Sequence, residues 1–173
     1  MFSRLFRFLG LVVLLFTAVY LLLPSPDFPP PPEGSLQSQE PADTESVYRR
    51  SYFTNLSRQD ITAYYAGKFK VSPGVPISLL QFRLNRPPEE AATLIRDQTR
   101  SSWLEEYNHP GREYIYINGF YPTKPTEQIN INNVHYENKI TVRMVPSHPV
   151  TRVTVLSLCA VCIVLLIKEY AKI

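Results

Sequence analysis

The sequence predicts an α+β protein in which a small mixed domain lies between two transmembrane helices. Two uncharged apolar runs, Phe8–Leu23 and Val153–Ile167, lie near the two ends of the chain. The segment between them, roughly a hundred residues after a linker, alternates helical with strand periodicity and can form one modest core. Both cysteines, Cys159 and Cys162, lie in the second run, so no disulfide can hold this domain together.

The first apolar run, Phe8–Leu23, is predicted to be a signal anchor that crosses the membrane and orients the chain. As a helix it is about 24 Å long, close to the thickness of the hydrocarbon layer. Arg4 and Arg7 precede the run and no lysine or arginine follows until Arg49, which keeps residues 1–7 in the cytoplasm. A cleaved signal peptide has the same start, but bulky leucines and prolines stand where small residues should flank the cut.

Residues 24–46 differ sharply in composition from the run before them. They contain seven prolines, five acidic residues and no basic residue. Four successive prolines at 29–32 favour polyproline II, which rises about 3 Å per residue and is semi-rigid. A Pro-x-x-Pro ligand is the functional alternative, but its usual partners are cytoplasmic. We therefore predict a spacer between the membrane and the domain.

The segment 47–148 is predicted to fold outside the cytoplasm in the order β-α-β-α-β-β-β. Ser57, three residues before Asp60, is a plausible cap for a helix that ends near Phe69 and has one apolar face. Pro87 begins a second helix, in which apolar residues at helical spacing continue to Tyr107. The expected strands are 47–53, 77–84, 113–118, 129–136 and 139–145. The Asn118-Gly119 pair is a strong turn signal.

The second apolar run is predicted to cross the membrane at 150–167, although Val153–Ile167 alone spans only about 22 Å. A buried core helix is the alternative, but the run is not amphipathic and a small β-rich domain has no room for it. Residues 168–173 then form a cytoplasmic tail. Both termini are expected in the cytoplasm and residues 24–149 outside, in the plasma (inner) membrane of a prokaryote or a secretory-pathway membrane of a eukaryote.

The composition argues against several classes of function. A net charge of +3, from 18 basic and 15 acidic residues, is too small and too dispersed for a nucleic-acid-binding surface. Cys159 and Cys162 have the spacing of a redox or zinc motif, but their apolar neighbours favour packing in the membrane, with lipidation as the alternative. We therefore expect no cofactor and no metal.

The best enzymatic candidates are Glu105, Glu106 and His109. Glu105 and His109 are four residues apart and would share a helix face with an adjacent second carboxylate. A metal site needs three or more ligands and a general base needs a pocket, so these residues are weak catalytic candidates. The corresponding hypothesis is a membrane-anchored enzyme that acts on envelope polymer or lipid.

The favoured hypothesis is a non-enzymatic interaction or assembly module of an envelope complex. Its expected docking patch is aromatic and surrounds the predicted turn, because exposed aromatic side chains often anchor protein interfaces. The candidates are Tyr114, Tyr116, Asn118, Gly119, Phe120 and Tyr121. The expected partners are membrane lipid and a protein of the membrane or envelope.

Overall fold

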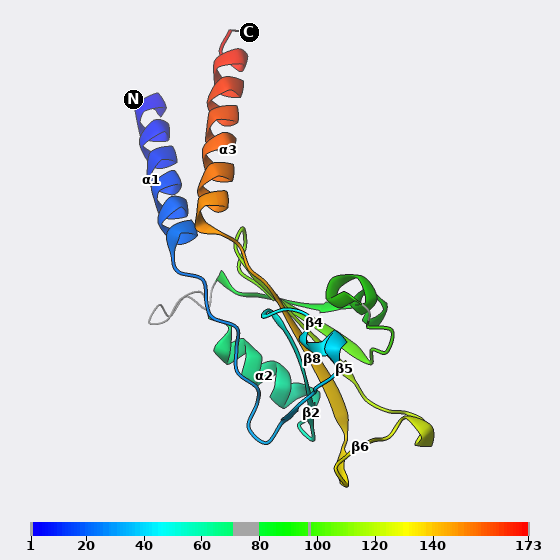
Figure 1. Ribbon diagram of the computed structural model, residues 1–173. Helices are drawn as coiled ribbons and strands as arrows, with labels where there is room; N and C mark the ends of the chain where they lie inside the picture. Colours follow the sequence, from blue (N-terminus) through cyan, green and yellow to red (C-terminus); the bar gives the residue numbers. More distant parts are fainter. Residues whose placement is uncertain (1, 71–79, 97, 173) are drawn as a thin grey trace. The chain divides into compact units, whose positions relative to one another are not determined.

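A computed structural model describes residues 2–70, 80–96 and 98–172 of the 173-residue chain (Figure 1). It confirms the mixed α+β class. The chain divides into two compact units. One unit contains the chain up to Ser25 together with the chain from Ser147 onward, and the other is Pro26–Pro146.

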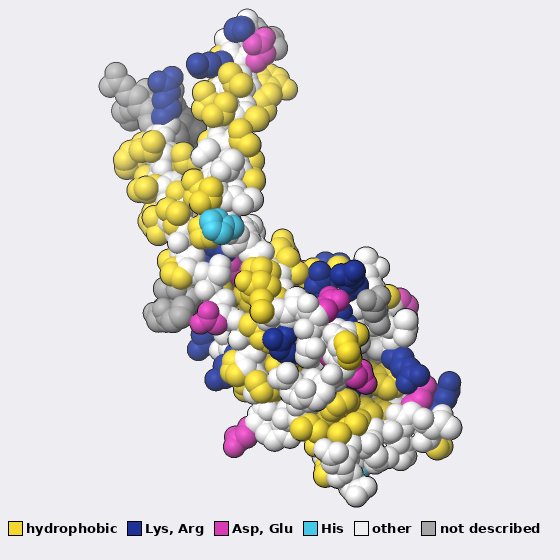
Figure 2. All heavy atoms as spheres, in the orientation of Figure 1, with side chains coloured by type: hydrophobic (Ala, Val, Ile, Leu, Met, Phe, Trp, Pro, Cys, Tyr) yellow, Lys and Arg dark blue, Asp and Glu magenta, His cyan; other side chains and the backbone are white. Residues whose placement is uncertain are grey.

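The first unit contains two long helices, α1 (Phe2–Leu22) and α3 (Pro149–Tyr170). Among the described residues, α3 alone is long and apolar enough to cross a membrane, with a mean hydropathy of 2.5, and the apolar part of α1, Arg7–Leu22, is shorter. Only 6% of the apolar segment of α3 is buried, so α3 is not a core helix. Hydrophobic side chains lie along both helices. Lys and Arg side chains lie at the end of α1 nearest the N-terminus and at the end of α3 nearest the C-terminus (Figure 2).

The second unit is organised by an antiparallel sheet, whose described strands run in the order β1-β2-β8-β5-β4-β3. The strands are β1 (Leu36–Gln37), β2 (Arg49–Thr54), β3 (Phe82–Arg86), β4 (Trp103–Asn108), β5 (Tyr114–Phe120) and β8 (Asn138–Val145). A separate hairpin joins β6 (Ile129–Ile131) to β7 (Val134–Tyr136). Its turn residues, Asn132 and Asn133, have φ angles of 50° and 64°, a conformation that asparagine tolerates.

Helix α2 (Arg58–Lys68) packs on one face of this sheet and confirms the predicted helix. The Ser57 hydroxyl accepts a hydrogen bond from the Asp60 amide at 3.2 Å, as expected of an N-cap. The buried face of α2 and the C-cap Phe69 meet alternate residues of the central strands. The core comprises Tyr52, Ile61, Tyr65, Phe69, Trp103, Tyr107, Ile115, Ile117, Ile140, Val142 and Met144.

Short helical turns lie over the opposite face of the sheet. They are η1 (Pro41–Thr44), η3 (Pro88–Glu90) and the π-helical turn η4 (Ala92–Arg96), and η5 (Pro125–Glu127) precedes β6. On this face Ala91, Ile95 and Leu104 of β4 form a second, smaller buried cluster. Leu94 and Tyr116 are partly buried against it. The sheet is therefore covered on both faces.

The predicted helix over residues 87–107 is wrong, and with it the order β-α-β-α-β-β-β. The segment forms η3 and η4 and then strand β4, which pairs with β3 on one side and β5 on the other. Along β4, Trp103 and Tyr107 face α2 whereas Leu104 joins the cluster on the other face. Pairing with β3 and β5 outweighs the local helical periodicity.

The turn predicted at Asn118-Gly119 is also wrong, because both residues lie within β5. The indole ring of Trp103 packs where a side chain of residue 119 would be, since a Cβ there would lie 2.0 Å from Trp103 Cε2. The β4–β5 connection instead turns at residues 109–113, where the Arg112 amide donates to the His109 carbonyl at 2.9 Å. Gly111 supplies the positive φ angle of 71° that this turn uses.

Three other predicted segments differ from the elements in the structure. The strand predicted at 129–136 is divided by the β6–β7 turn. Residues 77–79 of the strand predicted at 77–84 lie outside the described residues, and β3 begins at Phe82. Residues 26–46 are not a separate spacer but part of the second unit, since β1 pairs with β2 and the Tyr64 hydroxyl donates to the Pro31 carbonyl at 2.9 Å. Consecutive prolines leave their carbonyl oxygens free to accept such bonds.

Candidate functional site

A groove of about 420 Å³ lies on the sheet face opposite α2. Its floor is a row of three side chains from neighbouring strands, Phe53 of β2, Lys139 of β8 and Phe120 of β5. The register places Lys139 directly opposite both phenylalanines. The walls come from three other segments, around residues 40–43, 98–100 and 127–131. This volume is within the range of ligand-binding pockets, roughly 300–1,000 Å³.

Lys139 is held at the centre of the groove floor by two carboxylates. Its Nζ lies 2.6 Å from Asp43 Oδ2 and 2.8 Å from Glu40 Oε2. The same Nζ is 5.6 Å from the centre of the Phe53 ring, at cation–π distance. The ammonium group is therefore fixed in place between Phe53, which is buried, and Phe120, which is half-buried.

A buried hydrogen-bond network beneath the groove makes its floor rigid. Asp43 accepts hydrogen bonds from the hydroxyls of Ser38 at 2.6 Å and Ser51 at 2.8 Å, and Ser51 lies 2.7 Å from the Thr141 hydroxyl. Burial acts to raise the pKa of Asp43, but the hydrogen bonds from Lys139 and the two serines outweigh burial and lower the pKa below 3.8. Asp43 is therefore ionised at neutral pH and serves to orient its neighbours.

Arg100 adds an available cation at the rim of the groove. Its guanidinium carbon lies 5.9 Å from the centre of the Phe120 ring, and the residue is exposed. In the part of the chain that the structure describes, no carboxylate lies within ion-pair distance of this guanidinium. The groove thus sets the half-buried ring of Phe120 beside an exposed cation, a combination that can bind an apolar side chain next to an anionic group.

The two predicted catalytic carboxylates lie on opposite faces of β4 and bind different arginines. Glu105 faces α2, where Arg83 binds both of its oxygens at 2.9 Å and Arg58 adds a further ion pair. Glu106 faces the other side and pairs with Arg86, whose Nη2 lies 2.7 Å from Oε2. Burial acts to raise the pKa of Glu105, but hydrogen bonds from Arg83 and Arg58 lower it. These contacts make both carboxylates structural ion-pair partners.

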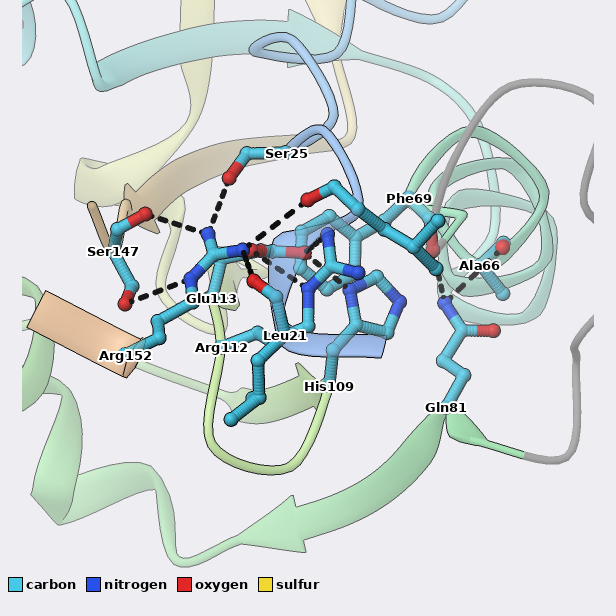
Figure 3. Close-up of polar contacts among 11 residues, drawn as sticks. Leu21, Ser25, Ala66, Phe69, Gln81, His109, Arg112, Glu113, Ser147 and Arg152 are labelled. Carbon is cyan, nitrogen blue, oxygen red and sulfur yellow. Dashed lines mark hydrogen bonds and ion pairs between the residues drawn. The ribbon is translucent and has the colours of Figure 1, made fainter. Parts of the chain in front are cut away.

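The third predicted catalytic residue, His109, belongs to a different cluster in the β4–β5 turn (Figure 3). Its Nδ1 lies 2.9 Å from Glu113 Oε1, which is also 3.0 Å from Arg112 Nη2. The imidazole ring stacks on Phe69 with ring centres 4.3 Å apart and planes 6° apart. The expected convergence of His109 with Glu105 and Glu106 in one cleft is not found.

The residues of the predicted docking patch separate into three environments. Asn118 and Gly119 are buried in β5. Tyr116 packs against the small Leu104 cluster, Tyr121 packs against the main core, and Tyr114 is half-buried. Phe120 lines the groove. Sequence reasoning missed its companions Phe53 and Lys139, since only the strand register brings them to Phe120.

The helical unit has a polar centre of its own at Arg152, in the first turn of α3. This side chain is only 4% exposed. Its guanidinium donates to the carbonyl oxygens of Leu21 at 3.2 Å and Leu23 at 3.4 Å, and also to the Ser25 hydroxyl (Figure 3). The Ser147 hydroxyl accepts a further bond at 3.1 Å. Arg152 therefore caps the C-terminal end of α1, whose last carbonyls have no partner within their own helix.

The described residues contain no group of three or more His, Cys, Asp or Glu placed to hold a metal ion. Cys159 and Cys162 are free thiols on the exposed surface of α3.

Comparison of the chain with known protein families, with curated proteins and with solved structures finds no match.

Proposed function

We propose that the chain is a two-pass membrane protein whose α+β unit binds a protein of the cell envelope through the groove at Phe53, Lys139 and Phe120. The groove carries this proposal, because it gathers aromatic rings and an available arginine over a rigid polar network. The occupant that fits best is an extended segment with an apolar side chain next to a carboxylate. The role is recognition or assembly, without chemistry on the bound segment.

The composition of the groove supports recognition in preference to catalysis. The hydroxyls of the network around Asp43, which belong to Ser38, Ser51 and Thr141, are all buried and engaged in hydrogen bonds. Lys139, the central cation, is bound to two carboxylates. None of these groups is arranged as an exposed nucleophile beside a general base.

The two long helices support membrane anchoring. The exposed apolar surface of α3 would be costly in water and is suited to lipid. The capping of α1 by Arg152 supports a helical hairpin in which α1 is retained, since removing α1 would leave a buried guanidinium without these acceptors. Arg4 and Arg7 before the apolar part of α1 favour a topology with the N-terminus in the cytoplasm and residues 24–149 outside.

Site-specific photocrosslinking in native membranes tests the groove. A photoreactive phenylalanine analogue at position 120 should label a distinct protein, and the same probe at Val47, which is 67% exposed and outside the groove, should not. Arg100→Glu should reduce labelling from position 120 at least several-fold, because the anionic group would then be repelled. Labelling that is equal at both positions, or that is unaffected by Arg100→Glu, would contradict the proposal.

A further inference from the structure

The outer edge of β3 has no partner among the residues that the structure describes. β4 pairs with one side of β3, and no described residue pairs with the other. The opposite edge of the sheet is β1, which has only two residues and so offers little backbone for pairing. β3 has five residues, of which Phe82, Arg83, Leu84 and Asn85 are exposed. Alternate residues of an antiparallel edge strand direct their N–H and C=O groups outward, available for another strand.

We propose that β3 pairs antiparallel with β3 of a second copy of this chain, about a two-fold axis at Leu84. This register places Leu84 opposite its symmetry mate, Phe82 opposite Arg86, and Arg83 opposite Asn85. Each pair lies on one face of the joined sheet, because the paired positions are separated by an even number of residues. The two sheets then form one continuous sheet with an isologous contact.

The side chains of β3 are complementary to themselves in this register. The apolar Leu84, 41% exposed in the single chain, would cover its own symmetry mate. Phe82, 51% exposed, would lie beside the aliphatic and guanidinium parts of Arg86. Arg83 would lie opposite Asn85, whose side-chain oxygen accepts a hydrogen bond from Arg58 at 2.8 Å and so adds no further charge to the contact. No two arginines face each other directly, and such like-charged pairs are the ones that destabilise strand pairing.

Local charge also permits two copies to approach. Arg83 is neutralised by Glu105, with Nη2 and Oε1 2.9 Å apart, and Arg86 by Glu106 at 2.7 Å. Arg86 also lies 3.5 Å from Glu90, and Arg58 shares Glu105 with Arg83. The three arginines around β3 are thus balanced by three carboxylates, so the edge carries no excess charge that would favour an acidic peptide over a second copy.

A single strand pair buries less surface than most stable interfaces, which need about 1,000 Å² or more. Confinement to a membrane raises the effective concentration of a second copy and compensates for this small area. The dimer is therefore expected in membranes and should weaken on dilution in detergent. The inference rests on the membrane anchoring proposed above, but it concerns a surface other than the groove and does not depend on the partner proposed for the groove.

Cysteine crosslinking of the full chain in membranes tests both the contact and its register. In a Cys159→Ala, Cys162→Ala background, Leu84→Cys should form a disulfide-linked dimer on mild oxidation. Phe82→Cys should not, because the two residues 82 would be four positions apart in register, about 13 Å along the strand and beyond disulfide reach. Leu36→Cys, on the other edge of the sheet, is the matched exposed control.

The proposal is supported if the yield of disulfide-linked dimer from Leu84→Cys is at least several-fold higher than the yields from Phe82→Cys and Leu36→Cys. Equal or absent crosslinking at the three positions overturns it, and so does a Leu84→Cys variant that links only to a different protein. All three positions are exposed, so these substitutions leave the core intact. Circular dichroism of each variant confirms that the chain is folded before oxidation.

Discussion

At the scale of single residues, the contact between Gly119 and Trp103 fixes how β4 and β5 pack. The two residues are directly paired, and the indole occupies the space that any larger residue at position 119 would need. Gly119→Ala should therefore destabilise the fold by about 1–3 kcal/mol, the usual cost of overpacking a core. Chemical unfolding of the full chain in detergent measures this loss.

Gly67→Ala is the matched control for that substitution. Gly67 lies in α2, and a methyl group added there would meet nothing within 4 Å outside its own stretch of helix. Alanine at this position should therefore be neutral or stabilising by up to about 1 kcal/mol. If the two variants unfolded at the same denaturant concentration, the packing role of Gly119 would be refuted.

Glu105 should make stability depend on pH in the acidic range. Its pKa lies below the ordinary value of 4.5, so the ionised carboxylate stabilises the fold above about pH 4.5 and this contribution is lost as pH falls through the lower folded pKa. Glu105→Gln removes the charge that Arg58 and Arg83 bind, and should cost about 1.5–3 kcal/mol at pH 7. The difference from the wild type should shrink as the pH is lowered below 4.

Unfolding of both proteins by denaturant at a series of pH values from 3 to 7 measures this effect. Glu89→Gln, at an exposed position, is the control and should leave the curve of stability against pH unchanged. A constant difference between wild type and Glu105→Gln at every pH would show that the pKa of Glu105 is the same in the folded and unfolded states, which would contradict the stabilising role of its ionised form.

At the scale of elements, sequence patterns predicted those whose determinants are local. Helix α2 has its cap at Ser57 and its buried face at Ile61 and Tyr65, all within a few residues of one another. The helical character of both apolar runs follows from composition alone. These elements are confirmed because no distant strand competes for their residues.

Strand β4 could not be predicted because its determinants are distant in sequence. Glu105 is buried only because Arg58 and Arg83 reach it from α2 and β3. A local sequence window contains the acidic pair but not these arginines, so the pattern favours a solvent-exposed helix. The groove was missed for the same reason, since Phe53 and Lys139 meet only through the β2–β8 register.

Because Arg152 of α3 donates hydrogen bonds to carbonyls at the end of α1, substitution of Arg152 should destabilise the pair of helices α1 and α3. Arg152→Ala leaves the Leu21 and Leu23 carbonyls without their donor and should cost about 1–3 kcal/mol. Arg152→Lys should recover only part of this, because a single ammonium group cannot reproduce the forked guanidinium contacts. Unfolding by increasing SDS in mixed micelles measures both, and Lys168→Ala, at the exposed end of α3, should have no effect.

At the scale of the whole molecule, the proposed topology predicts that both termini lie on one side of the membrane. An epitope tag before Met1 and another after Ile173 should both survive on the mature chain and be protected from protease in intact cells. A cysteine introduced at Glu137, an exposed position, should react with a membrane-impermeant reagent from outside. Loss of the N-terminal tag would indicate cleavage and a single-pass protein.

The position of β8 at the centre of the sheet has a consequence for biosynthesis. β8 joins β2 to β5, yet it is the last strand of the sheet to leave the ribosome and lies only a few residues before α3. Until residues 138–145 have emerged, β1–β2 and β3–β4–β5 are separate fragments with exposed edges. The domain can therefore fold only when almost the whole chain has been made. A stall in translation before Asn138 would leave a nascent chain with two unpaired groups of strands, whose exposed edges are prone to aggregate.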